Sequence, residues 1–213
     1  MLQIYKQEPP RSFVRHQRAF NAEFNNIPRL TKLILKKSLL EEQGFLCAYC
    51  MSKINCDNIK IEHWRSQSKK KYPFLQLAYS NLFAVCNGNE NNPPSNQYCD
   101  TKKGNKDLKF NLANQNLNIE EIVYYSSSGE IKSIDADFED ELNEVLGLNI
   151  SQLKDSRKKV LDSIINIIMN QNDKHSIQNF IQRWSSIDSS GHKKPYCAVA
   201  LYFLRKKLVS CRE

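Results

Sequence analysis

The stretch from residue 47 to residue 105 contains, in order, CAYC (47–50), IEHWRSQS (61–68), YSNLFAVC (79–86) and QYCDTKKGN (97–105). Two pairs of cysteines enclose a Glu-His step, an asparagine and an aspartate. Thiolates, imidazoles and carboxylates are the side chains with which proteins bind metals and move protons. This stretch therefore gives the strongest indication of both fold and function.

The cysteines predict a structural zinc site. Cys47 and Cys50 form a C-x2-C knuckle, a spacing at which one turn directs two thiolates toward one metal. A zinc ion held by four thiolates is tetrahedral and closed, so it needs a second pair, which Cys86 and Cys99 can supply. Twelve residues separate this second pair, which is a loose spacing. The alternative is four unrelated reduced thiols in a core.

Glu62 and His63 follow the β-prone run IKI at 59–61. Adjacent strand residues point to opposite faces, so both can serve one site only where a strand ends or bends. The sequence WRSQSKKKYP directly after His63 predicts such an end. The pair suits metal-assisted phosphodiester hydrolysis, because a carboxylate holds a divalent cation and a neutral imidazole takes a proton from water. Taken alone, the dipeptide favours the alternative of a surface histidine beside a solvated glutamate.

The order of these motifs resembles the HNH endonuclease family, whose ββα-metal core reads C-x2-C, then an acidic residue and His, then Asn-Leu, then a turn with cysteines, a metal ligand and a Lys. The matching positions are Cys47, Cys50, Glu62, His63, Asn81, Leu82, Cys86, Cys99, Asp100 and Lys103. The resemblance implies that His63 is the general base and that Asn81 orients it and fixes the loop. It also implies that Glu62 and Asp100 bind Mg²⁺ or Mn²⁺.

Two features depart from the family pattern. The third family position is usually His or Asn, and here it is Asp100, which is still a good oxygen ligand for Mg²⁺ or Mn²⁺. The other departure is the long insertion between Cys86 and Cys99. A carboxylate near a helix start is also an ordinary cap, which is the alternative for Asp100.

A narrower resemblance covers nearly the whole chain. These motifs, followed by a hairpin and an LGLN-x3-L-x3-R element at 146–157, look like the HNH nuclease subunits of Septu-type and retron-associated anti-phage defence systems, the PtuB group. The resemblance implies a role in bacterial antiviral defence. It implies an ABC/SMC-like ATPase partner, PtuA, and a retron reverse transcriptase with its DNA as further partners.

The charge of the chain favours nucleic acid as a partner. The net charge is +8, and residues 1–110 carry 18 Lys and Arg against 9 Asp and Glu, whereas residues 111–213 carry 13 against 14. A cationic excess near the proposed nuclease core is what a phosphate-backbone binder needs. The candidate phosphate-contacting residues are Arg65, Lys69, Lys70, Lys102 and Lys103. A solvated basic face is the alternative.

The composition, with 40% hydrophobic and 25% charged residues, is that of a globular protein. No run approaches the ~18 apolar residues of a membrane span, and the N-terminus lacks the apolar core of a signal peptide. The seven cysteines are grouped as for metal binding rather than for disulfides. We therefore expect a cytoplasmic protein without a membrane partner.

The expected architecture is α+β, with three regions: an arm and helix at 1–43, the HNH core at 44–110, and a hairpin plus mostly helical region at 111–213 that docks a partner. In the core we expect a hairpin carrying Cys47 to His63, then a loop, then a segment from Asn81 to Cys86 and a short helix near Asp100. Hydrophobic spacing predicts helices at 29–43, 135–148, 150–170, 174–187 and 195–209, and a hairpin at 119–134. In the first helix, Leu30, Leu33, Ile34 and Leu40 are the predicted core face.

The motifs favour a metal-dependent endonuclease that acts on DNA. The same nuclease acting on RNA or tRNA is one alternative, because the chemistry and a charged patch do not read the 2′-hydroxyl. A catalytically silent, zinc-stabilised module that binds nucleic acid is the other.

Overall fold

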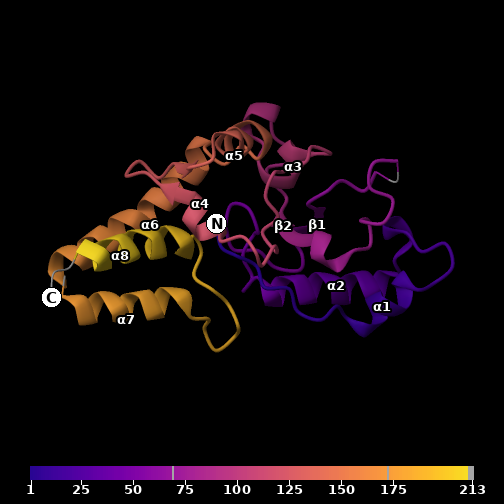
Figure 1. Ribbon diagram of the computed structural model, residues 1–213, viewed down its shortest axis with the longest axis horizontal. Helices are drawn as coiled ribbons and strands as arrows, with labels where there is room; N and C mark the ends of the chain where they lie inside the picture. The colour runs from indigo at the N-terminus through magenta and orange to yellow at the C-terminus, as the bar shows by residue number, and fades with distance from the viewer. Residues whose placement is uncertain (69, 172, 211–213) are drawn as a thin grey trace.

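The computed structural model describes residues 1–68, 70–171 and 173–210. Helices alternate there with two small antiparallel sheets, each of two strands, so the predicted α+β class is confirmed. Figure 1 shows an elongated molecule with the N-terminal helices (indigo) at one end, the C-terminal helices (orange to yellow) at the other, and the first sheet beside the N-terminal helices. None of the described helices combines the length and the apolar character that crossing a membrane requires.

Two helices form the N-terminal region, α1 (Arg11–Gln17) and α2 (Arg29–Glu42), and each begins directly after a proline. A proline at this position has no N–H to leave without a partner. Shortly after α2, Gly44 has a φ of +62°, the left-handed conformation that ends many helices. The helix predicted at 29–43 is therefore confirmed, together with its stop.

The face that α2 buries differs in part from the prediction. Leu40 is buried as expected, but Leu30, Leu33 and Ile34 are 68%, 52% and 40% exposed. The buried residues of α2 are Thr31, Leu35, Leu39 and Leu40. Leucine and isoleucine occur around most of this helix, so spacing alone does not select the face that packs.

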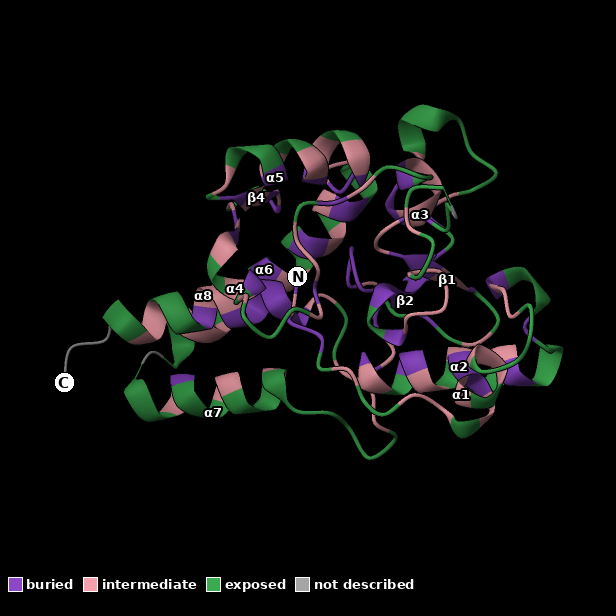
Figure 2. Cartoon of the chain, turned by 45° about the vertical axis from the view of Figure 1, so that its right-hand side comes forward, coloured by how far each residue is buried: buried purple, intermediate pink, exposed green. Residues whose placement is uncertain are grey.

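The first sheet pairs β1 (Ile59–His63) with β2 (Leu82–Cys86), so that His63 lies opposite Leu82. Every residue of β2 is buried, as Figure 2 shows in purple. The hairpin predicted to carry Cys47 to His63 is wrong, because the partner of β1 is β2, across the loop at 64–81. The segment that contains the cysteine knuckle instead forms an isolated antiparallel β-bridge between Leu46 and Lys53.

Short helical segments complete the first half of the chain. The 3-10 turn η2 (Tyr79–Asn81) leads into β2, and η3 (Pro94–Asn96) precedes helix α3 (Cys99–Lys103). The prediction of a short helix near Asp100 is confirmed. Because α3 contacts β2, the sheet and this helix form one unit.

The second sheet is the predicted hairpin, β3 (Val123–Tyr125) paired with β4 (Ile131–Ser133). Its first residues differ from the prediction, since 119–122 form a helical turn, α4 (Ile119–Ile122). The acidic segment that follows is helical as predicted, with α5 (Ala136–Asp140) continuing into a π-helical turn, η4 (Glu141–Val145).

The LGLN-x3-L-x3-R element joins the start of α3 to the second hairpin. The carbonyl of Leu146 accepts the N–H of Cys99 at 2.8 Å. The amide of Asn149 pairs with the backbone N–H and carbonyl of Ile131, both at 2.9 Å. Arg157 is 2% exposed and donates to the carbonyls of Gly129 (2.6 Å) and Leu148 (2.7 Å). The element is thus explained by backbone hydrogen bonds between segments.

Replacing this buried guanidinium is expected to destabilise the protein. In Arg157→Met the two carbonyls lose charge-assisted partners, so the free energy of unfolding should fall by about 2–4 kcal/mol. Urea unfolding followed by circular dichroism measures the change. Lys159→Met, an exposed substitution on the same helix, is the matched control and should stay within about 0.5 kcal/mol of the wild type.

The C-terminal helices are α6 (Ser151–Asn170), α7 (Lys174–Ser185) and α8 (Cys197–Ser210), close to the predicted ranges. The prediction that the last helix is buried all round holds for its first half only. Ala200 and Leu204 pack with Ile164 of α6 and Ile177 of α7, whereas Val209 is 89% exposed. The first half of α8 therefore completes a core within this chain.

Candidate metal centre and active site

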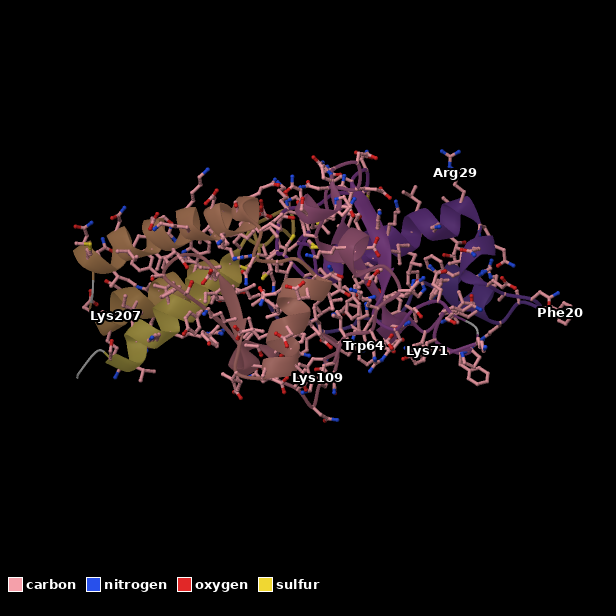
Figure 3. The ribbon with its side chains drawn as sticks, turned by 90° about the horizontal axis from the view of Figure 1, so that it is seen from above. Phe20, Arg29, Trp64, Lys71, Lys109 and Lys207 are labelled. Carbon is pink, nitrogen blue, oxygen red and sulfur yellow. The ribbon has the colours of Figure 1, made fainter. Side chains whose placement is uncertain are left out.

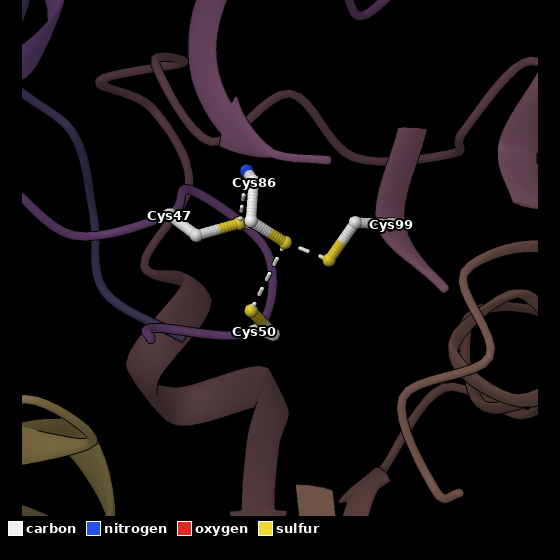
Figure 4. A group of neighbouring side chains, drawn as sticks. All are labelled: Cys47, Cys50, Cys86 and Cys99. Atoms are coloured by element: carbon white, nitrogen blue, oxygen red, sulfur yellow. Dashed lines mark hydrogen bonds between the residues drawn. The ribbon is translucent and has the colours of Figure 1, made fainter. Parts of the chain in front are cut away.

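Four cysteine side chains meet in one buried cluster (Figure 4). The knuckle supplies Cys47 and Cys50, the end of β2 supplies Cys86, and the start of α3 supplies Cys99. The Sγ atoms of Cys47 and Cys99 are 3.7 Å apart, as are those of Cys50 and Cys86. All four Sγ atoms lie within 4.8 Å of one another. The loose spacing of the second pair therefore does not keep it from the first.

The cluster fits a tetrahedral metal. Zn–S bonds of about 2.3 Å separate the sulfur atoms of a tetrahedral site by about 3.8 Å, close to the separations found. Burial, together with the neighbouring thiols, raises the pKa of the Cys99 thiol well above its usual range, and a divalent cation would offset the cost of charged sulfur atoms here. The four cysteines could therefore bind a structural zinc ion. Cys56 is not in the cluster, in line with its spacing.

A cleft of about 550 Å³ lies between β1, α2 and α3, and Glu62, His63 and Asp100 all line it. Strand β1 ends at His63, which removes the conflict that strict alternation would create between two adjacent strand residues. Asp100 follows Cys99 directly, so the cysteine cluster fixes the position of its backbone. The structure thus brings together three of the four residues for which a catalytic role is predicted.

The side chain of Glu62, which lines this cleft, is buried. It accepts a hydrogen bond from the Tyr49 hydroxyl at 3.2 Å and lies 2.6 Å from the Lys103 ammonium. Burial and the neighbouring Asp100 carboxyl raise the pKa of Glu62 to about 8, although Lys103 opposes this. Two neighbouring carboxyl groups form a donor set of oxygen atoms that suits a divalent cation.

The imidazole of His63 is held on two sides. Its Nε2 lies 2.9 Å from the Gln76 carbonyl oxygen. The ring of Phe24 packs edge-to-face against the imidazole, with ring centres 4.4 Å apart and an angle of 81° between the ring planes. A carbonyl only accepts, so Nε2 carries the proton and Nδ1 keeps the lone pair. Burial lowers the pKa of His63 to about 4, despite the bond to Gln76. The ring is therefore neutral at pH 7 and can accept a proton at Nδ1.

Asn81 uses its side chain to hold the loop that follows His63. Its Oδ1 accepts the N–H of Arg65 at 2.8 Å, and its Nδ2 donates to the carbonyls of Arg65 (3.0 Å) and Leu75 (2.9 Å). Its own carbonyl accepts the N–H of Trp64 at 2.9 Å. These bonds fix where the chain leaves β1 and so determine the direction of the His63 backbone.

Comparison with known proteins adds an independent observation. A protein named "Retron Ec83 putative HNH endonuclease", from Escherichia coli, is 35% identical over 85 residues, 35% of this chain and 33% of that protein. A second, "Retron Vc95 putative HNH endonuclease" from Vibrio cholerae serotype O1 biovar El Tor, is 27% identical over 154 residues, 70% of this chain and 74% of that protein. The chain is similar to HNH endonucleases. No family model matches it.

At this modest identity, the two homologues support an HNH endonuclease family and a nuclease function. The first match spans a third of that relative's length, and the second spans nearly three quarters.

The lysines and the arginine predicted to contact phosphates lie in different environments. Lys103 is 1% exposed and also donates to the His63 carbonyl at 3.0 Å, so its burial contradicts a surface role. Lys102 donates to the carbonyl of Asn143. The guanidinium carbon of Arg65 lies 4.1 Å from the centre of the Trp64 ring. The other two candidates are Lys70, which is exposed, and Lys69, which lies outside the described residues.

Sequence reasoning missed several residues of the cleft. Among them are Phe24, Lys32, Lys36 and Lys60, and the Gln76 carbonyl that contacts His63 was missed as well. Lysine spacing on α2 is ordinary for an exposed helix face, and nothing in one sequence indicates that α2 lies along the cleft. Lys60 lies two residues before Glu62 on β1, so the two side chains share a face of the strand. This spacing is the one signal in the sequence that could have indicated Lys60.

Proposed function

We propose that this protein is a metal-dependent HNH endonuclease that hydrolyses phosphodiester bonds, with DNA as the favoured substrate. The observation that carries the proposal is the common cleft of a neutral histidine and a pair of carboxyl groups. In this proposal β1, β2 and α3 are the ββα-metal core, and the four cysteines bind a structural zinc ion.

The residues divide the chemistry between them. His63 takes a proton from the attacking water at Nδ1, while the Gln76 carbonyl keeps Nε2 protonated and the ring in place. Glu62 and Asp100 would hold Mg²⁺ or Mn²⁺, which supplies charge neutralisation at the phosphate and the leaving oxygen. Asn81 fixes the loop behind the base.

The proposed setting is an anti-phage defence complex in the bacterial cytoplasm, with this chain as a PtuB-like subunit of a Septu-type or retron system. Both relatives are named for retrons, and the further partners in this proposal are a retron reverse transcriptase and its DNA. The proposed ATPase partner is ABC/SMC-like, as PtuA is. Residues 111–213 are the proposed docking region, and the exposed end of α8 around Val209 offers an apolar contact.

Cleavage by the purified protein tests the function. Labelled duplex DNA, single-stranded DNA and tRNA are incubated with Mg²⁺ or Mn²⁺, with and without the ATPase, and His63→Ala is the control. Cleavage by the wild type but not by His63→Ala supports the nuclease. The polymer that is cut in preference to the others identifies the substrate. Equal behaviour of wild type and variant in cleavage and in phage defence would support the silent binding module instead. A chelator is a poorer control because it also removes zinc.

A further inference from the structure

We propose that Lys32 and Lys36 of α2 form a phosphate-binding wall that holds the nucleic-acid backbone against the catalytic cleft. This inference rests on the proposed nuclease function and names residues that the HNH motifs do not contain. Neither lysine is among the basic residues that the sequence indicated.

The two lysines share a face of α2 that borders the cleft. They are four residues apart, so they lie one above the other on the helix, and both line the cavity that contains Glu62 and His63. Both are half-buried, as expected for lysines whose stems pack on the protein while the ammonium groups reach the solvent. The wall therefore borders the same cavity as the proposed reacting groups.

A chain of ring contacts connects this wall to the proposed base. The Lys32 ammonium lies 5.0 Å from the centre of the Phe24 ring, in cation–π geometry. Phe24, in turn, packs on the imidazole of His63 and is 5% exposed. A phosphate bound at Lys32 therefore lies one aromatic ring away from His63.

The charge balance of the cleft leaves these two cations for the substrate. Lys60 is neutralised by Glu90 at 2.8 Å and by Asp100 at 3.4 Å, and Lys103 is paired with Glu62. Among the described residues, neither Lys32 nor Lys36 has a carboxylate partner within ion-pairing distance. Like charges one turn apart on a helix repel, and an anion bound between them removes that repulsion.

The same lysines also line a second, more apolar hollow, so the proposed wall extends beyond the cleft. Leu30 and Leu33 border this hollow on the outer side of α2, and Arg29 projects outward at its start (Figure 3). A ligand that crosses the wall can therefore continue out of the cleft along α2. The proposed ligand is therefore a polymer of phosphates, which is long enough to contact residues of both hollows.

Salt-dependent binding tests the wall. The parent is His63→Ala, which should bind without cutting, and the test variant adds Lys32→Gln and Lys36→Gln. Affinity for labelled single-stranded and duplex oligonucleotides is measured by fluorescence anisotropy at several salt concentrations. Loss of two phosphate contacts should make the slope of log K against log salt shallower by about 1.4 for single strands or about 1.8 for duplex, and weaken binding about 10- to 30-fold at 0.15 M salt.

Matched variants make the result specific. Lys37→Gln removes a charge from the same helix at a residue that pairs with Glu41 at 3.7 Å and lines neither hollow, and it should leave the slope unchanged. The Lys32→Arg, Lys36→Arg variant keeps both charges and should retain binding, which also checks the fold.

An unchanged affinity and slope in the double Gln variant would overturn the wall while leaving the nuclease intact. A failure of the nuclease itself has a different signature, since the wild type then cuts no more than His63→Ala does.

Discussion

Replacing His63 is expected to reduce the rate of cleavage by about 10²–10⁴-fold, the contribution that a positioned general base makes to catalysis. The expectation follows from the neutral ring and from the free lone pair at Nδ1, which the Gln76 carbonyl determines. The substitution leaves the proposed metal ligands Glu62 and Asp100 in place, so the loss should appear in kcat rather than in substrate affinity.

The choice of substitution decides how clearly this result can be interpreted. His63 is 4% exposed, so His63→Ala leaves the Gln76 carbonyl without its partner and should also lower the free energy of unfolding by about 1–3 kcal/mol. His63→Gln is the better matched variant, because its amide can still donate to Gln76 but cannot take a proton near pH 7. We expect it to show the same reduction in rate and a thermal stability close to that of the wild type.

Single-turnover cleavage of a labelled oligonucleotide, with a melting curve for each variant, measures both quantities. A folded His63→Gln protein that cuts at the wild-type rate would refute the role of His63 as base. If both variants are inactive but also unfolded, the assay is repeated below their melting temperatures, where the rate alone decides.

The residues that meet in the cysteine cluster and in the cleft could be predicted from the sequence because short motifs contain them. The C-x2-C knuckle fixes two thiols within one turn, and the Glu62-His63 step marks a strand end by the polar run that follows it. Long helices with clear hydrophobic periodicity, such as 150–170, could be predicted for the same reason. The roles of these residues in catalysis stay predictions until cleavage is measured.

Features that depend on contacts distant in the sequence could not be predicted. The pairing of β1 with β2 crosses the loop at 64–81, and no local pattern names the partner strand. Lys103 looked like a surface cation, yet its burial beside Glu62 is a tertiary contact. The packing of α2 beside the cleft is a second tertiary contact of this kind. It places Lys32 and Lys36 at the cleft, which hydrophobic periodicity cannot predict.

Removal of the cysteine cluster is expected to have the largest effect on stability. Structural zinc contributes about 10–16 kcal/mol of apparent binding free energy in small zinc domains, as much as the total stability of a typical domain. Cys99→Ser should therefore no longer bind zinc. The region around β2 and α3 should no longer unfold in a cooperative transition. Metal content by elemental analysis and thermal unfolding by circular dichroism measure the two losses. Cys56→Ser, outside the cluster, is the matched control and should keep both properties.

The cluster should also govern activity, because the cysteine that closes it belongs to the helix that lines the cleft. Cys99 begins α3, Asp100 follows it, and Lys103 of the same helix pairs with Glu62. Loss of zinc should thus displace a proposed metal ligand and the partner of the other, so Cys99→Ser should be inactive even where His63 is intact. A zinc-free Cys99→Ser protein that melts and cuts like the wild type would show that the four thiols are ordinary core residues.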